Sequence, residues 1–560
     1  MEDVLGPCLD RGIPIVANAG GLNPAGLAAR LGDLAAKLGL AARIAYLTGD
    51  DLAPRIGALA AEGHAFTHAD TGVPLAGADR PVVTANAYLG GWGIAAALEA
   101  GADVVVCPRV TDASLAVGPA AWWHGWARDN WDALAGAVAA GHVIECGPQA
   151  TGGNYSFLEE VTDRRYPGFP IAEIAADGSS VITKHDGTGG LVSVGTITAQ
   201  LLYEIGAPAY LNPDVTAHFG TVRLQQAGPD RVAISGTRGS PPPDTLKVAL
   251  NMLGGYRNTT TMVVCGLDIE EKAAHAEKLL FDLLGGADRF GEVDVRLLRF
   301  DHPDATANEE ATAHLRITVK DQDEALVGRA FSNVTQELAL GGYAGFHTTS
   351  PPTAASAYGV YWPALVPAGV VTQTVHLPDG TSQVVPHTPG VPATSVSSAT
   401  SVSSATSGVP VTPGVPATSS AAAGSSASSA VPATPALPVA FGPDATSYVR
   451  IPLGRIAGAR SGDKGGNANV GLWARSDEAY AWLRRELTVQ RFRELLTEAA
   501  ALGVQRYELP NLRALNFVVE GLLAPGVAAT TRPDAQAKGL GEYLRSRTVS
   551  VPAALAARLT

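Results

Sequence analysis

Residues 84–119, TANAYLGGWGIAAALEAGADVVVCPRVTDASLAVGP, contain the pattern that decides the fold of the N-terminal part of the chain. The segment 80–91 favours a strand and a loop, and residues 91–102 favour a helix. Residues 103–114 favour a second strand that ends in a polar loop. Strands that alternate with helices in this way are typical of a parallel sheet covered by helices.

The same repeat occurs upstream. GIPIVANAG at 12–20 is typical of a short buried strand, and residues 24–40 place leucines at helical spacing. Asn23 is predicted to cap that helix, with Pro24 in its first turn. ARIAYLTGDDL at 42–52 predicts another strand and turn. We therefore predict an α/β protein whose large domain has a mostly parallel sheet flanked by helices.

The second half of the large domain has less regular patterns. After the rigid turn SPPPD at 240–244, a helix is expected to begin near Thr245. Residues 261–336 predict the order strand, helix, strand, strand, helix. Residues 371–385 predict a hairpin, because Asp379 and Gly380 separate two β-rich runs.

A low-complexity segment at 387–446 divides the chain. It contains Pro, Ser, Thr, Ala, Val and Gly almost without charge, and TPGVPATS occurs at 388–395 and again at 412–419. Such a segment buries too little apolar surface to offset the entropy of ordering, so we expect a disordered linker that lets the C-terminal domain move. The predicted domains are 1–386 and 447–560. The second is expected to be a small α+β domain of ferredoxin-like arrangement.

The composition limits the classes of partner. The net charge is −13, whereas nucleic acid and anionic membranes attract basic surfaces, so we expect neither as a partner. The first ten residues, MEDVLGPCLD, lack the basic and apolar regions of a secretory signal. The four cysteines show no CxxC spacing, which favours reduced thiols in the cytoplasm. A second copy of the chain, in a homo-oligomer, is among the candidate partners.

Polar loops follow the predicted strands. In a parallel sheet such loops meet at one edge, where helix N-termini and free backbone N–H groups bind ligands. We therefore expect a small acidic molecule to bind there. The predicted binding residues in the large domain are Asn18, Gly20, Gly21, Asn23, Asn86, Tyr88, Gly90, Gly91, Arg109, Thr111, Ser114, Asn154 and Asp186.

Four charged residues in these loops have predicted roles. Arg109 suits a carboxylate or a phosphate, because a guanidinium offers a planar fork of donors. Asp50, Asp51 and Asp112 are candidates for general acid–base catalysis. The structural alternatives are helix capping by the Asp50–Asp51 pair and a structural ion pair between Arg109 and Asp112.

The C-terminal domain contributes a further candidate loop. RSGDKGGNAN at 460–469 includes Asp463, Lys464 and Gly465, and its backbone N–H groups could form an anion-binding nest. A tight β-turn that displays solvated charges is the equal alternative.

Several familiar motifs are missing from the sequence. It contains no GxGxxG, Walker, HExxH or GxSxG pattern, so no cofactor is implied and the metal content is unknown. A metal-dependent enzyme using Asp50, Asp51 and Asp112 is a weaker hypothesis, because these acids lack a fixed ligand spacing.

A set of motifs supports a family assignment. They are NAGGLNP, GDDL, the whole run 84–119, GHVIECGPQATGGNY, DGTGG and RSGDKGGNANVG. Together they resemble the acyclic terpene utilization (AtuA) family, whose members pair a DUF1446-type domain with an AtuA-like ferredoxin-fold domain. The resemblance implies a part in the breakdown of acyclic terpenoids such as citronellol and geraniol, through branched acyl-CoA thioesters. Family members usually begin with a further strand and helix bearing a Gly-Phe-x-Gly-Asp-like loop, so we expect either a truncated start or a missing wall of the site here.

Two functional hypotheses follow from this resemblance. The first is an enzyme of branched acyl-CoA or carboxylic acid metabolism, of the hydratase, lyase or isomerase type, with a carboxylate or acyl-CoA ligand. The second is a non-catalytic subunit that binds or assembles the enzymes of a terpenoid-degradation pathway.

Overall fold

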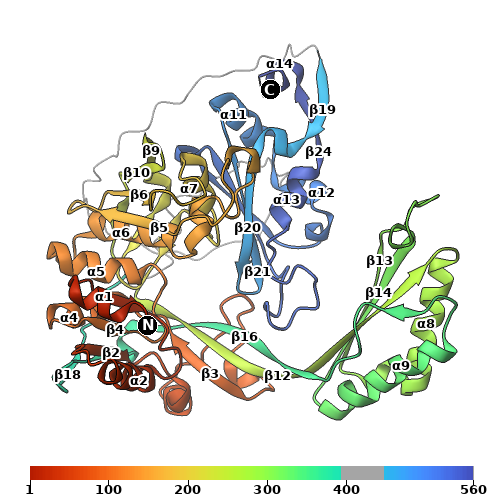
Figure 1. Ribbon diagram of the computed structural model, residues 1–560, viewed down its shortest axis with the longest axis horizontal. Helices are drawn as coiled ribbons and strands as arrows, with labels where there is room; N and C mark the ends of the chain where they lie inside the picture. Colours follow the sequence, from red (N-terminus) through yellow and green to blue (C-terminus); the bar gives the residue numbers. More distant parts are fainter. Residues whose placement is uncertain (392–446, 559–560) are drawn as a thin grey trace, which may run out of the picture.

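The structure is a computed structural model that describes residues 1–391 and 447–558. Figure 1 shows an N-terminal body with several sheets, an arm that projects away from it, and a C-terminal domain that lies against the body. Among the described residues, no helix has the length and apolar character needed to span a bilayer.

The predicted βα repeats form a small parallel unit near the N-terminus. Strands β1 (Ile15–Ala17), β4 (Val104–Val106) and β2 (Ile44–Thr48) pair in parallel in that order. Asn23 caps the helix after β1 as predicted, since its side chain accepts a hydrogen bond from the Gly26 N–H at 2.8 Å. The helices of this unit are α1 (Leu5–Asp10), α2 (Pro24–Lys37), α3 (Ile56–Ala61) and α4 (Trp92–Glu99).

The prediction of a mostly parallel sheet is not confirmed; the fold is a mixed α/β arrangement. The predicted hairpin, β17 (Thr374–His376) and β18 (Ser382–Val384), is confirmed, and β17 adds to β2 in the antiparallel sense. β3 (Val82–Ala87) leaves the parallel unit and pairs antiparallel with β12 (Thr245–Cys265). The βα pattern is a local signal, whereas the partner of β3 lies far along the chain, so the sequence pattern could not identify it.

β12 is the long central strand of the molecule, and the prediction of a helix that begins near Thr245 is therefore wrong. Its β-branched Val and Thr residues suit a strand that is largely buried. The first half pairs with β3 and β16 (Ser356–Pro367), and the second half pairs with β14 (Thr312–Asp321). The register with β16 shifts between Leu253 and Gly255, where Gly255 has a φ of +111°. This bulge separates the half of β12 in the body from the half in the arm.

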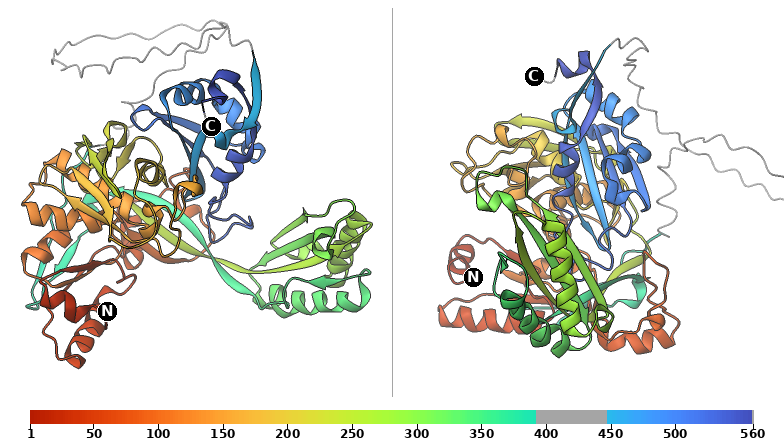
Figure 2. Two further views of the ribbon diagram at one scale, coloured as in Figure 1. Left: turned by 45° about the horizontal axis from the view of Figure 1, so that its top comes forward. Right: turned by 90° about the vertical axis from the view of Figure 1, so that its right-hand side faces the viewer.

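The arm has the predicted order of strands and helices and a hydrophobic core of its own. β13 (Glu292–Arg299), β14, the second half of β12 and β15 (His347–Thr348) form its sheet. Helices α8 (Ile269–Leu284) and α9 (Phe331–Gly341) belong to the same core. Figure 1 and the left view of Figure 2 show the arm joined to the body by the long strands β12 and β16.

The remaining part of the body surrounds α6 (Trp131–Ile144), which is buried along most of its length. Two antiparallel sheets contact it, and α5 (Ser114–His124) and α7 (Val194–Leu201) pack beside it. The first sheet contains β5 (Pro170–Ile174), β6 (Ser180–Lys184), β10 (Arg231–Ser235) and β9 (Arg223–Gly228). The second contains β11 (Arg238–Ser240), β8 (Thr216–His218) and β7 (Ala209–Leu211).

The C-terminal domain has a four-stranded antiparallel sheet covered by helices. Its strands, in spatial order, are β20 (Ala457–Lys464), β21 (Asn467–Ala474), β23 (Ala514–Val519) and β22 (Val504–Leu509). A separate pair consists of β19 (Tyr448–Pro452) and β24 (Thr548–Pro552). The helices are α11 (Asp477–Glu486), α12 (Val489–Leu495), α13 (Leu540–Ser546) and α14 (Ala553–Ala556).

The C-terminal domain is docked on the body and shares its core. Trp473, Leu509, Leu512 and Ala514 belong to the same hydrophobic cluster as the residues of α6. Buried amides add specific contacts: Asn469 Nδ2 donates to the Leu202 carbonyl at 2.8 Å, and Asn516 Nδ2 donates to the Gly206 carbonyl at 2.8 Å. A loosely tethered domain, as expected from the linker, would lack such contacts.

The predicted linker was expected to be disordered from residue 387 onwards, but its first residues are ordered. Residues 387–391 pack on the body, where Thr388 is buried and the Val391 N–H donates to the Pro242 carbonyl at 2.9 Å. The Val391 carbonyl in turn accepts from the Asp244 N–H. The remaining part of the predicted linker, 392–446, lies outside the described residues.

Candidate functional site

The floor of the candidate site is one face of the sheet formed by β3, β12 and β16. Because side chains alternate along a strand, Asn86, Ala249 and Pro363 form one row across this face. Thr84, Asn251 and Tyr361 form the next row, and Asn251 Nδ2 donates to Thr84 Oγ1 at 3.0 Å. Strands from three distant parts of the chain thus present a polar surface.

The loops after β1 and β4 stand beside this floor and complete a cavity of about 500 Å³. Five of the predicted binding residues line it: Asn18, Gly21, Asn86, Tyr88 and Arg109. The strand ends therefore bring polar loops together as expected, but against an antiparallel floor.

Arg109 is the cation of this cavity. Its Nη1 lies 3.6 Å from Asp112 Oδ1, and its Cζ lies 4.6 Å from the centre of the Tyr88 ring. Asn18 Nδ2 also donates to Asp112 Oδ1, at 3.4 Å. Both charged side chains remain partly exposed, at 38% for Arg109 and 47% for Asp112, so the guanidinium keeps donors free for an anion.

Asp50 and Asp51 have structural contacts. Asp50 is buried, and its Oδ2 accepts from Asn86 Nδ2 at 2.8 Å and from the Arg109 N–H at 3.3 Å. Burial raises the pKa of Asp50. Asp51 is exposed and accepts from the Ala53 N–H at 3.0 Å, as a turn cap. The structure therefore places Asp50 behind Asn86 and Arg109 as a positioning residue.

A carboxylate of the protein itself occupies another predicted binding loop. The Gly91 N–H, at the start of α4, donates to Asp214 Oδ2 at 2.7 Å, and Ser114 Oγ donates to the same atom at 3.3 Å. A Cβ at Gly90 would lie 2.2 Å from Asp214 Oδ1, and Thr111 Oγ1 lies 2.6 Å from Ser114 Oγ. Burial raises the pKa of Asp214 to about 6.

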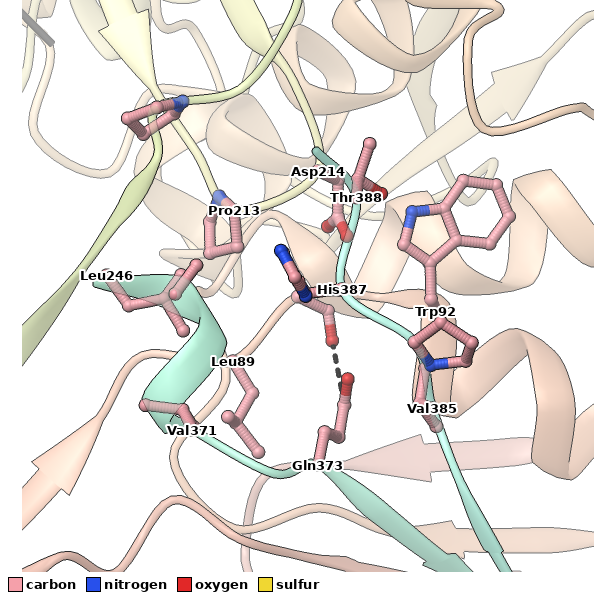
Figure 3. A pocket seen from close by; sticks show the side chains of 14 residues that line it. Leu89, Trp92, Pro213, Asp214, Leu246, Val371, Gln373, Val385, His387 and Thr388 are labelled. Atoms are coloured by element: carbon pink, nitrogen blue, oxygen red, sulfur yellow. Dashed lines mark hydrogen bonds between the residues drawn. The ribbon is translucent and has the colours of Figure 1, made fainter. Parts of the chain in front are cut away.

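Figure 3 shows Asp214 among the side chains that line a small cavity of about 40 Å³, including those of Leu89, Trp92 and Pro213. The helix N-terminus here already has its anion. These donors are taken, so a substrate would need to bind elsewhere.

A second cavity, of about 770 Å³, lies between the body and the C-terminal domain. Tyr361 lines both this cavity and the first one. Lys247 also connects them, since its Nζ lies 5.0 Å from the Tyr88 ring centre and 5.6 Å from the Tyr361 ring centre. We call the two cavities together the interdomain cleft.

The C-terminal domain enters the cleft through the β20–β21 hairpin, which points towards β16 in Figure 1. Lys464 and Asn467 are paired across the hairpin, with only Gly465 and Gly466 between them. The backbone is thus a tight β-turn, in which Gly465 has a φ of +66°. The charges are not all free in solvent, however, because Lys464 and Gly465 line the cleft and Asp463 Oδ1 lies 3.8 Å from Lys538 Nζ.

Lys464 has an unusual environment. Its Nζ donates to the Glu204 carbonyl at 3.2 Å. The low polarity of the surrounding protein and the charge of Lys247 lower the pKa of Lys464 to about 8. Part of its population therefore carries a neutral amine near physiological pH.

Four further candidates were not among the predicted site residues: Glu145, Glu204, Lys247 and Tyr361. Lys247 and Tyr361 lie on strands, and only the register of β12 with β16 places them beside the loops. Glu145 follows the buried helix α6, and its position in GHVIECGPQ was a usable signal. Burial and the neighbouring acids Asp112 and Glu204 raise the pKa of Glu145 to about 8.

The Glu145→Gln variant tests this buried acid. Because the folded-state pKa is raised, the wild-type protein loses stability as the pH rises from the ordinary glutamate pKa, 4.5, to about 8. Glutamine cannot ionise, so we expect the Tm difference, variant minus wild type, to become more positive between pH 5 and pH 8.5. Scanning calorimetry at both pH values measures it, and a constant difference would contradict the assignment.

Four other predicted residues do not line the cleft. Asn154 and Asp186 are exposed, and neither lines either cavity. Asn23 serves as the cap of α2. Gly20 is needed for packing, since a Cβ there would lie 2.5 Å from the Cys107 carbonyl oxygen.

The hypothesis of a metal site on Asp50, Asp51 and Asp112 gains no support from the geometry. Their carboxylates point to separate partners, namely Asn86, Ala53 and Arg109. Within residues 1–391 and 447–558, no group of three or more His, Cys, Asp and Glu side chains could hold a metal ion.

The comparisons with known proteins address the family. The model of the family described as "Acyclic terpene utilisation family protein AtuA" matches residues 1–377. The chain belongs to the AtuA family. A second model, the AtuA ferredoxin-like domain, matches residues 451–550, which contain β20–β23 and thus the hairpin of Lys464. No curated protein and no solved structure matched this AtuA family chain.

Proposed function

We propose that this protein is an enzyme of acyclic terpenoid breakdown that binds a branched carboxylic acid, or its acyl-CoA thioester, in the interdomain cleft. One observation carries the proposal: the cations Arg109, Lys247 and Lys464 line the cleft of a chain whose net charge is −13. A local positive region in an acidic protein favours a small anion and does not attract polyanions. The family assignment supports the pathway.

The groups around Arg109 suit proton transfer next to a bound carboxyl or thioester group. Arg109 would hold the anion, and Asp112, 3.6 Å from it, would act as the acid–base residue. Burial raises the pKa of Asp112, which brings it closer to the range useful for proton transfer. Reactions of the hydratase, lyase or isomerase type need such a pair. Asp50 would act indirectly, by holding Asn86 and the Arg109 backbone.

A thermal-shift panel of branched free acids and their CoA thioesters tests the proposal. At a ligand concentration of about one hundred times Kd, binding adds about 2.7 kcal/mol of stability and raises the Tm. We expect Arg109→Ala to abolish this rise and Arg109→Lys to retain part of it, because lysine keeps the charge without the fork of donors.

Arg30→Ala provides the matched control, since Arg30 is an exposed arginine on α2 away from the cleft. It should respond to ligand as the wild type does. If no acid or thioester raises the Tm, or if Arg109→Ala responds fully, the proposal fails.

Assembly is the second candidate function, and the projecting arm favours it. The arm has its own core and stands apart from the body in Figure 1 and in the left view of Figure 2. Leu267, Leu340 and Phe300 are exposed on it, Leu340 at 97%. An arm of this kind suits contact with a second copy or with partner enzymes. A monomeric mass by light scattering would count against self-assembly.

A further inference from the structure

Lys464 differs from its neighbour Lys538, because no carboxylate in the described part of the chain is its partner. The acids on either side, Glu204 and Asp463, lie 3.3 Å and 3.8 Å from Lys538 Nζ. The described hydrogen-bond partner of Lys464 Nζ is the Glu204 backbone carbonyl, which is neutral. The amine is therefore held in place at the tip of a rigid hairpin without being fixed in an ion pair.

A second cation faces the same space. Lys247 and Lys464 both line the larger cavity, one from the body and one from the C-terminal domain, and Tyr361 lies between the two cavities. Two ammonium groups that share a cavity repel each other. The repulsion is relieved when one of the two lysines loses its proton. An amine next to another cation is a known means of making a lysine nucleophilic at neutral pH.

We propose that Lys464 is a nucleophilic amine that forms an iminium with the ketone or aldehyde carbon of the substrate. This inference rests on the proposed function and narrows its substrate class to branched oxo acids. The larger cavity, about 770 Å³, accepts the carbonyl end, and the smaller one, about 500 Å³, places the carboxylate at Arg109. Tyr361 borders both cavities.

The chemistry needs no reagent beyond a proton. The Lys464 nitrogen lone pair forms a bond to the carbonyl carbon, while the carbonyl π electrons move to oxygen, which takes one of the two protons of the nitrogen. A further protonation releases this oxygen as water, the nitrogen keeps one proton, and a C=N⁺ bond remains. The amine, the carbonyl and one proton thus give the iminium and water. Glu145, close enough to Lys464 for each charge to shift the pKa of the other, supplies that proton directly or through water.

Reductive trapping tests the inference. The full-length protein is incubated with 4-oxopentanoate, a keto acid, and sodium cyanoborohydride near pH 7.5, and the modified lysines are located by peptide mass spectrometry. A drop of its pKa to about 8 increases the neutral fraction of Lys464 on the order of a hundredfold over an ordinary lysine. We therefore expect labelling at Lys464, which is itself exposed, to exceed that at other exposed lysines by at least about tenfold.

Two variants provide the controls. Lys464→Arg keeps the charge and should lose the adduct, whereas Lys538→Met removes the neighbouring lysine of the same domain and should keep it. Lys538 is the lysine that best matches Lys464 as a control, because it forms an ion pair with Glu204. A Tm within a few degrees of the wild type shows that each variant is folded.

The pH profile of labelling separates a reactive amine from one that is only accessible. The charged groups that act on Lys464 all lie in the body: Lys247, Glu204, Glu145 and Asp70. Lys247→Met removes the repelling charge, so the midpoint of labelling at Lys464 should move to higher pH. A profile that does not move would overturn the role of Lys247.

Equal labelling of Lys464 and the exposed lysines would overturn the inference. If the free acids still raise the Tm in that case, the proposed function stands and only the covalent step is lost. If neither the acids nor the keto acid has any effect, both proposals fail.

Discussion

Replacing Asn469 with leucine should lower the free energy of unfolding by roughly 3 kcal/mol or more, because it leaves several buried polar groups without a partner. Asn469 is fully buried between the two domains. Its Oδ1 accepts from the Glu204 N–H at 2.9 Å, and its Nδ2 donates to the Leu202 carbonyl and to Asn516 Oδ1. Leucine has a similar volume but satisfies none of these groups.

Urea unfolding measures the loss, and hydrogen exchange locates it. We expect the Asn469→Leu variant to show faster exchange in residues 202–206 and 464–470, where the hairpin meets the body. Asn467→Leu, two residues away on the same strand but only half-buried, is the matched control and should lose less than about 1 kcal/mol. Equal effects of the two variants would contradict a specific role of the buried amide in docking.

Removal of the Asp214 carboxyl should lower the free energy of unfolding by about 2–4 kcal/mol. The Asp214→Ala variant leaves the Gly91 N–H at the start of α4 without an acceptor and takes away the partner of Ser114. It also leaves a cavity in a site where Asp214 is 2% exposed.

Asp214→Asn is the control, because the amide keeps an acceptor oxygen of the same shape. It should be much closer to the wild type, most of all below pH 6, where Asp214 gains its proton. Urea unfolding at pH 5 and pH 7.5 compares the variants. An Asp214→Ala protein as stable as the wild type would show that the loops 90–91 and 111–114 do not depend on this internal anion.

The sequence predicted the local elements well and the distant pairings poorly. The strands and helices of 12–106 lie where their patterns place them, because capping and periodicity are local properties. The pairing of β3 with β12 joins residues such as Asn86 and Ala249, which are far apart in the chain. Long-range pairing of this kind leaves no signal in either segment alone. The composition of 245–265 was the available clue to β12, since it is rich in β-branched residues.

The candidate site could be predicted only in part, for the same reason. Asn18, Asn86 and Arg109 follow strands, and the rule that polar loops gather at strand ends placed them together. The rule could not show that Asp214 already fills the helix N-terminus at Gly91. Lys464 was identified from its glycine loop, but its neighbour Lys247 lies on a strand of the other domain, and only the folded protein brings them into one cavity.

The central claim is that one ligand occupies a cleft built by both domains. A crystal structure of the full-length protein with 4-oxopentanoate bound tests it most directly. We expect ligand density that begins at the Arg109 guanidinium and extends past Tyr361 to Lys464. Density at another place, such as the apolar surface groove beside Trp122 and Trp123, with the space between Arg109 and Lys464 filled only by water, would contradict it.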